Sequence, residues 1–367
     1  MNSVFVEAHI SDLHFGATDP KLQYEILAEQ FIDRIKTMDV LDIVSINGDI
    51  FDHKFMANSL AVSYANMFIS QLVMLAKERG FTILIISGTY EHDADQLKLF
   101  YPYQMWDVDI RIIEQVRFEY VKGKRILCIP ELYGKGKEYY EDFLFHSGVY
   151  DSCYLHGTIA GSIYGKDIPD LNSPREPIFS INHFVNCKGP IISGHVHKSS
   201  VFETYFYYCG SPYRWRFGEE EEKGFLILLH NISNGEHYVH FEPIKSFRYD
   251  TVNLDDMLES DPQSIIAYID NLKANGIDYL RVIFTKDNEA VLSVIRNHFR
   301  SNKFIRIDTS KSMKVKQDLE EVQEKYDQFQ FLKDQSDPET KLVQYINQKE
   351  GYTFITADQL KEFISSL

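Results

Sequence analysis

Five short polar segments combine the carboxylate and imidazole side chains that bind divalent metal ions. In chain order they are SDLHFG, NGDIFDH, GTYEHD, YLHG and SGHVHKS. Neutral imidazoles and carboxylates are preferred ligands of manganese, iron and zinc. One carboxylate can also bridge two such ions ~3.5–4 Å apart, as in two-metal hydrolases. The residues of interest in these segments are Asp12, His14, Asp49, Glu91, His92, His156, His195 and His197.

None of these segments is specific on its own. The chain has 13 histidines, and a histidine taken at random is usually a surface or core residue. The five segments become informative together, because each follows a predicted strand and ligands collect beyond the carboxyl ends of strands in α/β sheets. We assign the remaining histidines to the surface or the core, apart from His53: His9, His146, His183, His230, His237, His240 and His298.

The elements that must position these side chains alternate along residues 1–245. Helical periodicity appears in Lys21–Thr37 and Ala57–Arg79, and HNISNGEHYVHF predicts a hairpin at Asn-Gly. Helices between strands predict a layered α/β architecture. The predicted strands are Val4–His9, Ile43–Asn47, Thr82–Ile86, Arg125–Cys128, Ser152–His156, Pro190–Ser193, Thr204–Tyr208 and Phe225–Leu229.

A second, smaller α/β unit is predicted for residues 246–310. Strand and helix patterns alternate there as Tyr249–Asn253, Pro262–Lys273, Tyr279–Phe284, Glu289–Arg300 and Phe304–Ile307. The last part, 311–367, is polar and predicted to be helical, with N-cap signatures in SDPETKLVQYINQ and TADQLKEFISSL. The sequence therefore predicts three parts.

Composition and charge limit the functional classes. The four cysteines show no metal-binding spacing and fit buried thiols in a reducing compartment. We find no signal peptide and no apolar run of membrane-spanning length, and we expect a cytoplasmic protein that does not bind a membrane. The net charge of −16 argues against a protein that holds nucleic acid unaided, because phosphate contacts usually require a basic surface.

The order of the five segments resembles the signature of the calcineurin-like metallophosphoesterases, D-x-H, G-D, G-N-H-[DE], H and G-H-x-H. Residues 207–225, YYCGSPYRWRFGEEEEKGF, are similar to the GSP…FGE…KGF segment of SbcD-type nuclease subunits. These subunits, phage recombination endonuclease subunits among them, work with an SMC-like ATPase in double-strand-break repair and recombination. The resemblance covers about Val4 to Phe225.

The resemblance implies a fold and partners. The core would be a layered β-sandwich flanked by helices, followed by a small α/β capping domain and a helical tail. The tail would dock on the coiled coil of an SbcC-type ATPase, and DNA would be the substrate. A homodimer formed through the helices in Lys21–Thr37 or Ala57–Arg79 is also implied.

The resemblance also implies two metal sites, with two Mn²⁺ as the expected ions and Mg²⁺, Fe²⁺ or Zn²⁺ as alternatives. Asp12, His14, Asp49 and His197 would hold one ion. Asp49, the residue at position 91, His156 and His195 would hold the other. Metals of this kind polarise a phosphoryl oxygen and lower the pKa of a bridging water. His92 would be the catalytic histidine, which orients the phosphate or protonates the leaving oxygen.

The GTYEHD segment departs from the family pattern. Glu91 stands where the family has asparagine, and Thr89 and Tyr90 are inserted after Gly88. We expect Glu91 to bind the second ion, which would tighten cation binding and weaken the Lewis acidity of that ion. In the alternative, the turn is remodelled and Glu91 swings out, which leaves a weak or empty second site.

Further residues are candidates for contact with DNA or for a catalytic role. His53 is near a position that assists exonuclease activity in some relatives, although Asp52 occupies that place. The arginines around Trp215 could contact phosphates or bases, or pair with Glu219–Glu222 instead. We expect KGKR at 122–125 to be a solvated hairpin. The DNA-binding candidates are Lys54, Lys198, Arg214, Trp215 and Arg216.

The leading hypothesis is a two-metal DNA exonuclease or endonuclease subunit that hydrolyses phosphodiester bonds with metal-activated water and acts with an ATPase in DNA end processing. A phosphoesterase that acts on small molecules or phosphoproteins would share the same metal site. A metal-binding scaffold with impaired catalysis is the third hypothesis, because the GTYEHD turn is altered.

Overall fold

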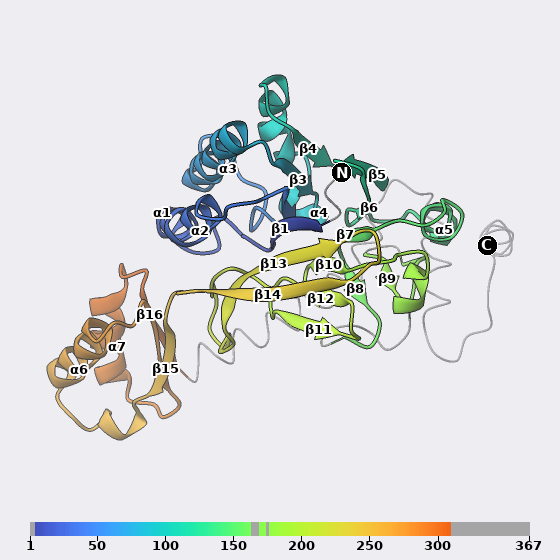
Figure 1. Ribbon diagram of the computed structural model, residues 1–367. Helices are drawn as coiled ribbons and strands as arrows, with labels where there is room; N and C mark the ends of the chain where they lie inside the picture. Colours follow the sequence, from blue (N-terminus) through green and yellow to red (C-terminus); the bar gives the residue numbers. More distant parts are fainter. Residues whose placement is uncertain (1–3, 163–168, 174–175, 310–367) are drawn as a thin grey trace, which may run out of the picture. The chain divides into compact units, whose positions relative to one another are not determined.

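Two sheets and their flanking helices build the first part of the chain (Figure 1). The computed structural model describes residues 4–162, 169–173 and 176–309. The chain divides into two compact units, Met1–Tyr249 and Asp250–Leu367. The tail predicted for 311–367, with its role in ATPase docking, lies outside the described residues. The three-part division therefore stays a prediction.

The first sheet of the described residues has the strand order β14-β13-β1-β2-β3-β4. Strands β1 to β4 are parallel, while β13 runs antiparallel to β1 and pairs with β14 in the predicted hairpin. The inner strands β2 and β3 are fully buried and mainly β-branched and aliphatic, as expected for strands covered on both faces. The bounds are β1 Val4–Ile10, β2 Ile43–Asn47, β3 Thr82–Ile86, β4 Ile110–Ile113, β13 Lys223–Asn231 and β14 His237–Ile244.

The second sheet of the described residues has the order β11-β12-β10-β7-β6-β5. Phe5 and Leu84 of the first sheet share one apolar cluster with Ile126, Tyr154 and Ile192 of the second, so the two sheets pack against each other. The bounds are β5 Arg117–Val121, β6 Lys124–Ile129, β7 Ser152–His156, β10 Ile191–Gly194, β11 Ser200–Phe202 and β12 Phe206–Tyr208, with a small separate pair, β8 Thr158–Ile159 and β9 Ile178–Phe179.

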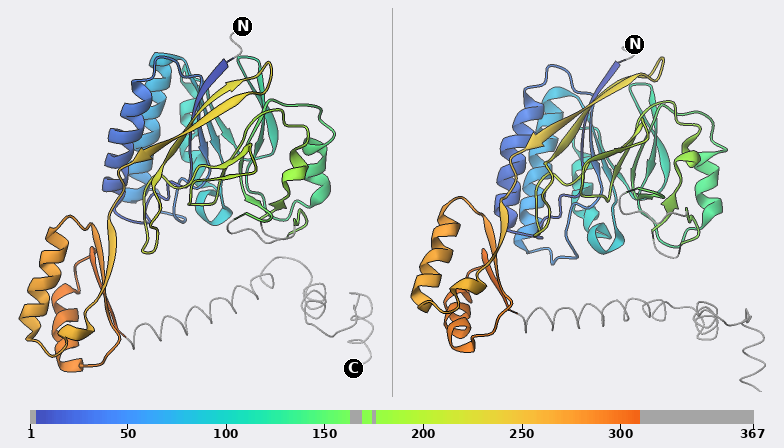
Figure 2. Two further views of the ribbon diagram at one scale, coloured as in Figure 1. Left: turned by 60° about the horizontal axis from the view of Figure 1, so that its bottom comes forward. Right: turned by 90° about the horizontal axis from the view of Figure 1, so that it is seen from below.

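Helices lie on the outer sides of the two sheets. Helices α1 (Pro20–Ile26) and α3 (Leu60–Arg79) lie side by side next to the first sheet, and α5 (Lys137–Leu144) lies on the opposite side (Figure 2). Tyr140 and Leu144 of α5 pack into a cluster with residues of the second sheet. These layers confirm the predicted α/β class. Short helical segments complete the unit: η1 Leu27–Ile32, α2 Asp33–Lys36, α4 Tyr90–Asp93, η2 Gln96–Met105 and η3 Ile181–Phe184.

Both long predicted helices form, with local differences. The helix predicted for Lys21–Thr37 contains a π-helical turn, η1, between α1 and α2. Helix α3 begins after Ser59, whose hydroxyl accepts a hydrogen bond from Val62 N, and ends at Gly80 in the left-handed conformation. By length and composition α3 could also cross a membrane, but half of the relevant window is buried inside this unit, as in a core helix.

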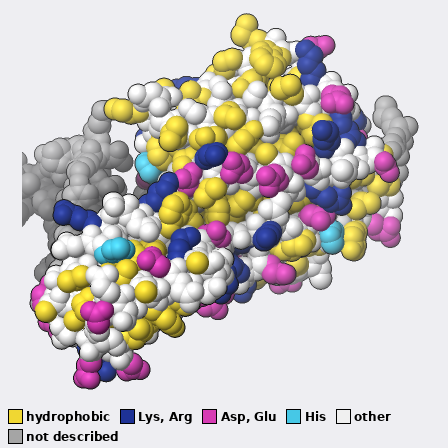
Figure 3. Space-filling model, turned by 90° about the vertical axis from the view of Figure 1, so that its left-hand side faces the viewer, with side chains coloured by type: hydrophobic (Ala, Val, Ile, Leu, Met, Phe, Trp, Pro, Cys, Tyr) yellow, Lys and Arg dark blue, Asp and Glu magenta, His cyan; other side chains and the backbone are white. Residues whose placement is uncertain are grey.

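One face of α3 carries exposed apolar side chains. Leu60, Met67 and Met74 are 67%, 44% and 63% exposed, and they follow one another at seven-residue intervals. Figure 3 views the side of the molecule on which α1, α2 and α3 lie, and hydrophobic side chains gather there between charges of both signs. A seven-residue apolar repeat is the pattern of a helix that packs on another helix.

The hairpin at 122–125 differs from expectation. Lys122 and Gly123 form the exposed turn between β5 and β6, as predicted, but Lys124 is fully buried. Its ammonium group pairs with the buried carboxylate of Glu7 and donates to Tyr154 Oη at 2.9 Å. The hairpin is therefore solvated only at its turn, because the β1 carboxylate between the sheets requires a cationic partner.

The second unit is described from Asp250 to residue 309. Its strands follow the order β15-β16-β17, and its helices pack on this sheet through Ile265, Ile269 and Ile295. All five elements predicted for this region are present, and a short 3₁₀ turn, η4 (Asp255–Met257), is added. The bounds are β15 Tyr249–Asn253, α6 Pro262–Ala274, β16 Tyr279–Phe284, α7 Glu289–Phe299 and β17 Ile305–Thr309.

Candidate metal centre

The carboxyl ends of six strands from both sheets bring the chemically active side chains together. Segments at the ends of β1, β2 and β3 of the first sheet meet segments at the ends of β6, β7 and β10 of the second. In the described residues, four groups of side chains could hold a metal ion, and within each group the donor atoms lie within 4.8 Å of one another. The groups are Asp12–His14–His197, His14–Asp49–His92, Glu131–His156–His195 and Asp12–Asp49–His156.

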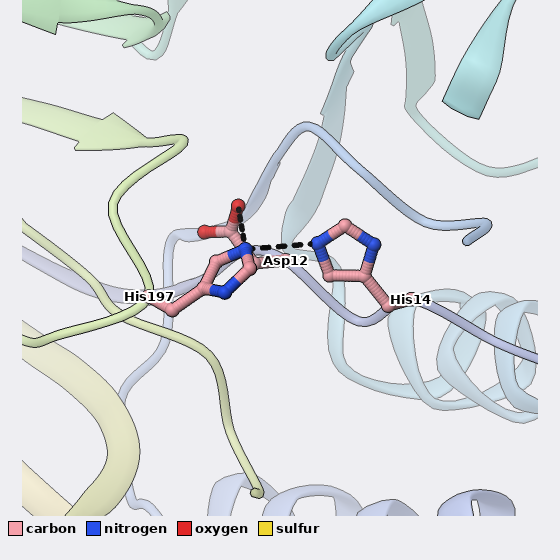
Figure 4. A group of neighbouring side chains, drawn as sticks. All are labelled: Asp12, His14 and His197. Atoms are coloured by element: carbon pink, nitrogen blue, oxygen red, sulfur yellow. Dashed lines mark hydrogen bonds and ion pairs between the residues drawn. The ribbon is translucent and has the colours of Figure 1, made fainter. Parts of the chain in front are cut away.

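The first group is formed by Asp12, His14 and His197 (Figure 4). The Nε2 atoms of His14 and His197 are 3.1 Å apart, and His197 Nε2 is 3.9 Å from Asp12 Oδ1. Asp49 Oδ2 approaches to 3.8 Å from His14 Nε2. Burial lowers the pKa of His14 well below its ordinary value, so its imidazole is neutral, the form that binds metals.

The second group lies on the other side of Asp49. His156 Nε2 is 3.3 Å from Asp49 Oδ2 and 3.8 Å from Glu131 Oε2. His195 Nδ1 is 3.1 Å from the same Glu131 oxygen. Burial opposes charge on both Asp49 and His156, but their mutual attraction lowers the pKa of Asp49 and raises that of His156. Asp49 thus faces both groups, as a bridging carboxylate does.

The backbone at these residues is strained. Asp12, His14, Asp49 and His195 all have positive φ, at 53°, 42°, 55° and 82°. This left-handed region is uncommon for residues other than glycine. Residues held in such conformations concentrate at functional sites, where the surrounding structure must hold them in place. The hydrogen bond from Asp12 N to the carbonyl of Gly48, at 3.0 Å, is one such restraint.

Three glycines allow the strand ends to approach each other. A Cβ atom on Gly48 would lie 2.2 Å from His156 Nδ1, and one on Gly88 would lie 2.2 Å from Asp49 Oδ1. A Cβ on Gly194 would lie 2.1 Å from a backbone oxygen of the β2 end and 2.8 Å from His156. Any side chain at these positions would therefore displace the candidate ligands.

Neighbouring oxygen atoms orient the imidazoles. His156 Nδ1 lies 2.8 Å from the carbonyl oxygen of Asn47, which leaves Nε2 free to face Asp49. His197 Nδ1 is 3.5 Å from the buried carboxylate of Glu219, which leaves its Nε2 facing His14. Metal-binding histidines usually have such a partner on the other ring nitrogen, because it fixes the ring and its tautomer.

Asp93 joins the turns that follow β2 and β3. Its two carboxylate oxygens accept hydrogen bonds from the backbone N–H groups of Asp49, Ile50 and Gly88, each at 2.9 Å. Burial and the nearby charge of Asp49 raise the pKa of Asp93. Asp93 therefore positions the turn that carries Asp49.

Glu91 does not point into either group. Its side chain is exposed, and it accepts a hydrogen bond from Tyr133 Oη at 2.9 Å. In this geometry Glu91 lies apart from both groups, as in the alternative of a remodelled turn. The physical reason is the inserted Thr89, which takes the place beside Asp49: Thr89 N donates to Asp49 Oδ1 at 2.7 Å.

Glu131 is the residue that sequence reasoning missed. It lies just beyond β6, in the segment IPELYG, and its side chain joins His156 and His195. A signal was available in the sequence. The other five segments were identified as polar residues that follow a predicted strand, and Glu131 also follows one. However, no histidine or aspartate stands next to Glu131 in the segment, so it lacks the paired residues that mark four of the other five.

The two predicted catalytic histidines differ in position. The ring of His92 lies 4.8 Å from that of His14, and His92 joins a group with His14 and Asp49. The His53 side chain is 59% exposed, pairs with Asp52 at 2.8 Å and belongs to none of the groups found in the described residues. Asp52 Oδ1 is in turn 3.9 Å from His14 Nδ1, so His53 reaches the centre only through Asp52.

The arginines of the predicted DNA-binding set contact the glutamate segment. Arg214 donates to the carbonyl oxygens of Glu220 and Glu221, at 2.7 and 3.2 Å, and Arg216 Nε lies 3.5 Å from the Glu219 carboxylate. The alternative in which the arginine pair binds Glu219–Glu222 thus accounts for their geometry.

Of the other members of that set, Trp215 contacts a candidate metal ligand. The Trp215 ring lies 5.1 Å from that of His197, with the Arg216 guanidinium 5.1 Å from the indole. Lys54 Nζ lies 4.3 Å from the ring centroid of Tyr90, and Lys198 is exposed next to His197.

Comparisons with known proteins give little further information. No family model matches the chain, and no curated protein matches it. Among solved structures 23 chains match; one of them has 12% sequence identity and a TM-score of 0.36, over 65% of this chain and 99% of the other. Neither fold nor function follows from similarity at this level.

Proposed function

We propose that this chain is a metal-dependent DNA phosphodiesterase with a layered β-sandwich core of the calcineurin-like type. The observation that carries the proposal is the position of Asp49, whose carboxylate lies 3.8 Å from His14 Nε2 in one ligand group and 3.3 Å from His156 Nε2 in the other. Two ligand groups that share a carboxylate are typical of hydrolases that act on phosphoesters.

The donor set fits divalent cations, with two Mn²⁺ as the proposed ions. When bound, such ions would polarise a phosphoryl oxygen and activate water for attack. The groups at Asp12, His14 and His197 and at His156 and His195 would hold them. His92 borders the first group and supplies a proton to the leaving oxygen, since an imidazole is an effective proton donor near neutral pH.

DNA is favoured as the substrate by the segment at 207–225 and by the presence of a second α/β unit, both of which resemble SbcD-type subunits. A pocket of about 310 Å³ opens beside the first group, lined by His197, Arg216, Phe217 and Glu219 among others. The net charge of −16 favours a subunit that holds DNA with the help of the bound cations and an SMC-like ATPase.

A homodimer through α3 is part of the proposal. The exposed repeat of Leu60, Met67 and Met74 would pack on the same stripe of a second copy. A charged residue in this stripe would prevent that packing. Met67→Glu is therefore expected to convert dimers to monomers in multi-angle light scattering, while the exposed Val201→Glu outside the stripe should leave the dimer intact.

Digestion of linear duplex DNA with Mn²⁺ tests the proposal. We expect cleavage by the wild type, and its loss with EDTA, with Asp49→Ala and with His92→Ala. Hydrolysis of small phosphodiesters without DNA cleavage would show a phosphoesterase for small molecules, which the pocket of about 310 Å³ could also accommodate. Full metal occupancy without turnover of any phosphoester would show a binding scaffold and contradict the proposal.

A further inference from the structure

Glu131 is a buried carboxylate with no conventional partner. Its backbone N–H donates to the carbonyl of Ser87 at 3.3 Å, which ties the end of β6 to the end of β3. Its side chain is only 1% exposed, and neither carboxylate oxygen accepts a hydrogen bond from the described residues. No lysine or arginine of the described chain forms an ion pair with it; the groups that face it are the imidazoles of His156 and His195.

Burial of an ionised carboxylate lowers the stability of the protein unless a cation lies beside it. Removal of an ionised carboxylate from water has an effective penalty of several kcal/mol, and this penalty is offset only by good partners. Elsewhere in this unit the same requirement is met by a side chain, because Lys124 pairs with the buried Glu7. At Glu131 the facing groups are the imidazoles of His156 and His195, which must be neutral to bind a metal ion and then supply no positive charge to the carboxylate.

The geometry around Glu131 suits a metal ion. Its Oε2 lies 3.1 Å from His195 Nδ1 and 3.8 Å from His156 Nε2, and His156 Nε2 lies 3.3 Å from Asp49 Oδ2. Ligands held about 2.0–2.2 Å from one ion stand roughly 3 Å or slightly more from each other. Thr89 Oγ1, 3.3 Å from Asp49 Oδ2 and 3.4 Å from His156 Nε2, adds a neutral oxygen at the same place.

We propose that Glu131 is the charged oxygen ligand of the second cation, the role that the sequence suggested for Glu91. This inference rests on the proposed metal-dependent function. It places a full negative charge where a neutral amide would stand in the family pattern, and so strengthens binding of the second ion relative to an amide ligand. Glu91, directed to Tyr133 at the surface, has no part in metal binding.

Mn²⁺ titration of the full chain without DNA, by calorimetry, tests this assignment. We expect two ions for the wild type and for the control Glu91→Gln. We expect one ion for Glu131→Ala, and at least tenfold weaker binding of the second ion for the isosteric Glu131→Gln. Unchanged binding of the second ion in both Glu131 variants would overturn the assignment, as would fewer than two ions in the wild type.

Thermal unfolding at pH 8.5 separates a ligand from a residue that only orients His195. If Glu131 is a ligand, Glu131→Gln raises the melting temperature in EDTA, because it removes an unpaired buried charge, and lowers it relative to wild type in saturating Mn²⁺. If Glu131 only orients His195, the variant is destabilised in both conditions, and the assignment fails. Neither measurement uses DNA. If the second Mn²⁺ binds in a Glu131-dependent way but the protein does not cleave DNA, the nuclease proposal is refuted and the assignment of Glu131 as a ligand stands.

Discussion

The indole ring of Trp215 lies 4.9 Å from the imidazole ring of His14, measured between ring centroids. Its backbone N–H donates to the buried Glu219 carboxylate at 3.1 Å, and this carboxylate also faces His197. Trp215 therefore covers two candidate ligands of the first group. A ring that covers metal ligands excludes water from them, and this lowers the local dielectric and strengthens the electrostatic interactions of the site.

Trp215→Ala is expected to weaken binding of the first Mn²⁺ ion about tenfold, the lower end of the effect of residues that support metal ligands. DNA affinity measured in Ca²⁺ should change less, because the ring faces the imidazoles rather than solvent. Calorimetry and fluorescence anisotropy measure the two effects, and Trp106→Ala, at an exposed tryptophan outside the site, is the control. Loss of DNA affinity with unchanged metal binding would instead make Trp215 a stacking platform for bases.

Gly48→Ala is expected to destroy the site. The new Cβ would lie 2.2 Å from His156 Nδ1 at a backbone φ of +88°, so the substitution combines overpacking with backbone strain, at roughly 3 kcal/mol together. Gly80→Ala is the matched control, because its φ is +76° but no atom lies within 4 Å of the Cβ. In urea unfolding, the control should lose about 1 kcal/mol of its free energy of unfolding, from backbone strain alone. Equal losses in the two variants would contradict the packing argument.

Lys124→Met is expected to destabilise the protein by roughly 3–5 kcal/mol, because it leaves the buried Glu7 carboxylate without its cation. The double variant Glu7→Gln with Lys124→Met should lose less than Lys124→Met alone, since no unpaired charge remains. Urea unfolding of the two single variants and the double variant measures the coupling. Additive losses would show that the two side chains act independently between the sheets.

His230 predicts a pH dependence of stability. Burial, followed by the charge of Lys124, lowers its pKa from 6.5 to about 3. Between these values the unfolded chain binds a proton that the folded chain excludes, so His230 costs stability as the pH falls, by up to about 1.4 kcal/mol per pH unit. In EDTA, His230→Gln should flatten the stability profile between pH 6.5 and 4. Parallel profiles for variant and wild type would contradict this account.

Much of the fold follows from local patterns, and its departures have identifiable causes. The fully buried, mainly apolar strands β2 and β3 and the capped helix α3 were predictable because local sequence and tertiary environment agree. The buried Lys124 was not, because its burial depends on Glu7, far away in the chain. Strands as short as β8 and β9 carry too few residues for a period-2 pattern.

In the candidate site, too, the residues marked by local sequence were predictable and those placed by tertiary contacts were not. Motif order identified the residues after β1, β2, β7 and β10, because each motif carries two ligands or a glycine turn. It did not predict the direction of the Glu91 side chain, because that direction depends on how the inserted Thr89 packs against Asp49. Glu131 meets His156 only because β6 and β7 pair in parallel, with Ile129 opposite Leu155, so that their ends coincide.

Anomalous scattering from a manganese-soaked crystal tests the central claim most directly. The account predicts two peaks ~3.5–4 Å apart, with Asp49 between them. Oxygens of Glu131 should lie about 2.1–2.3 Å from the second peak, and Glu91 should contact neither. A single peak, or two peaks without a shared Asp49, would contradict the account.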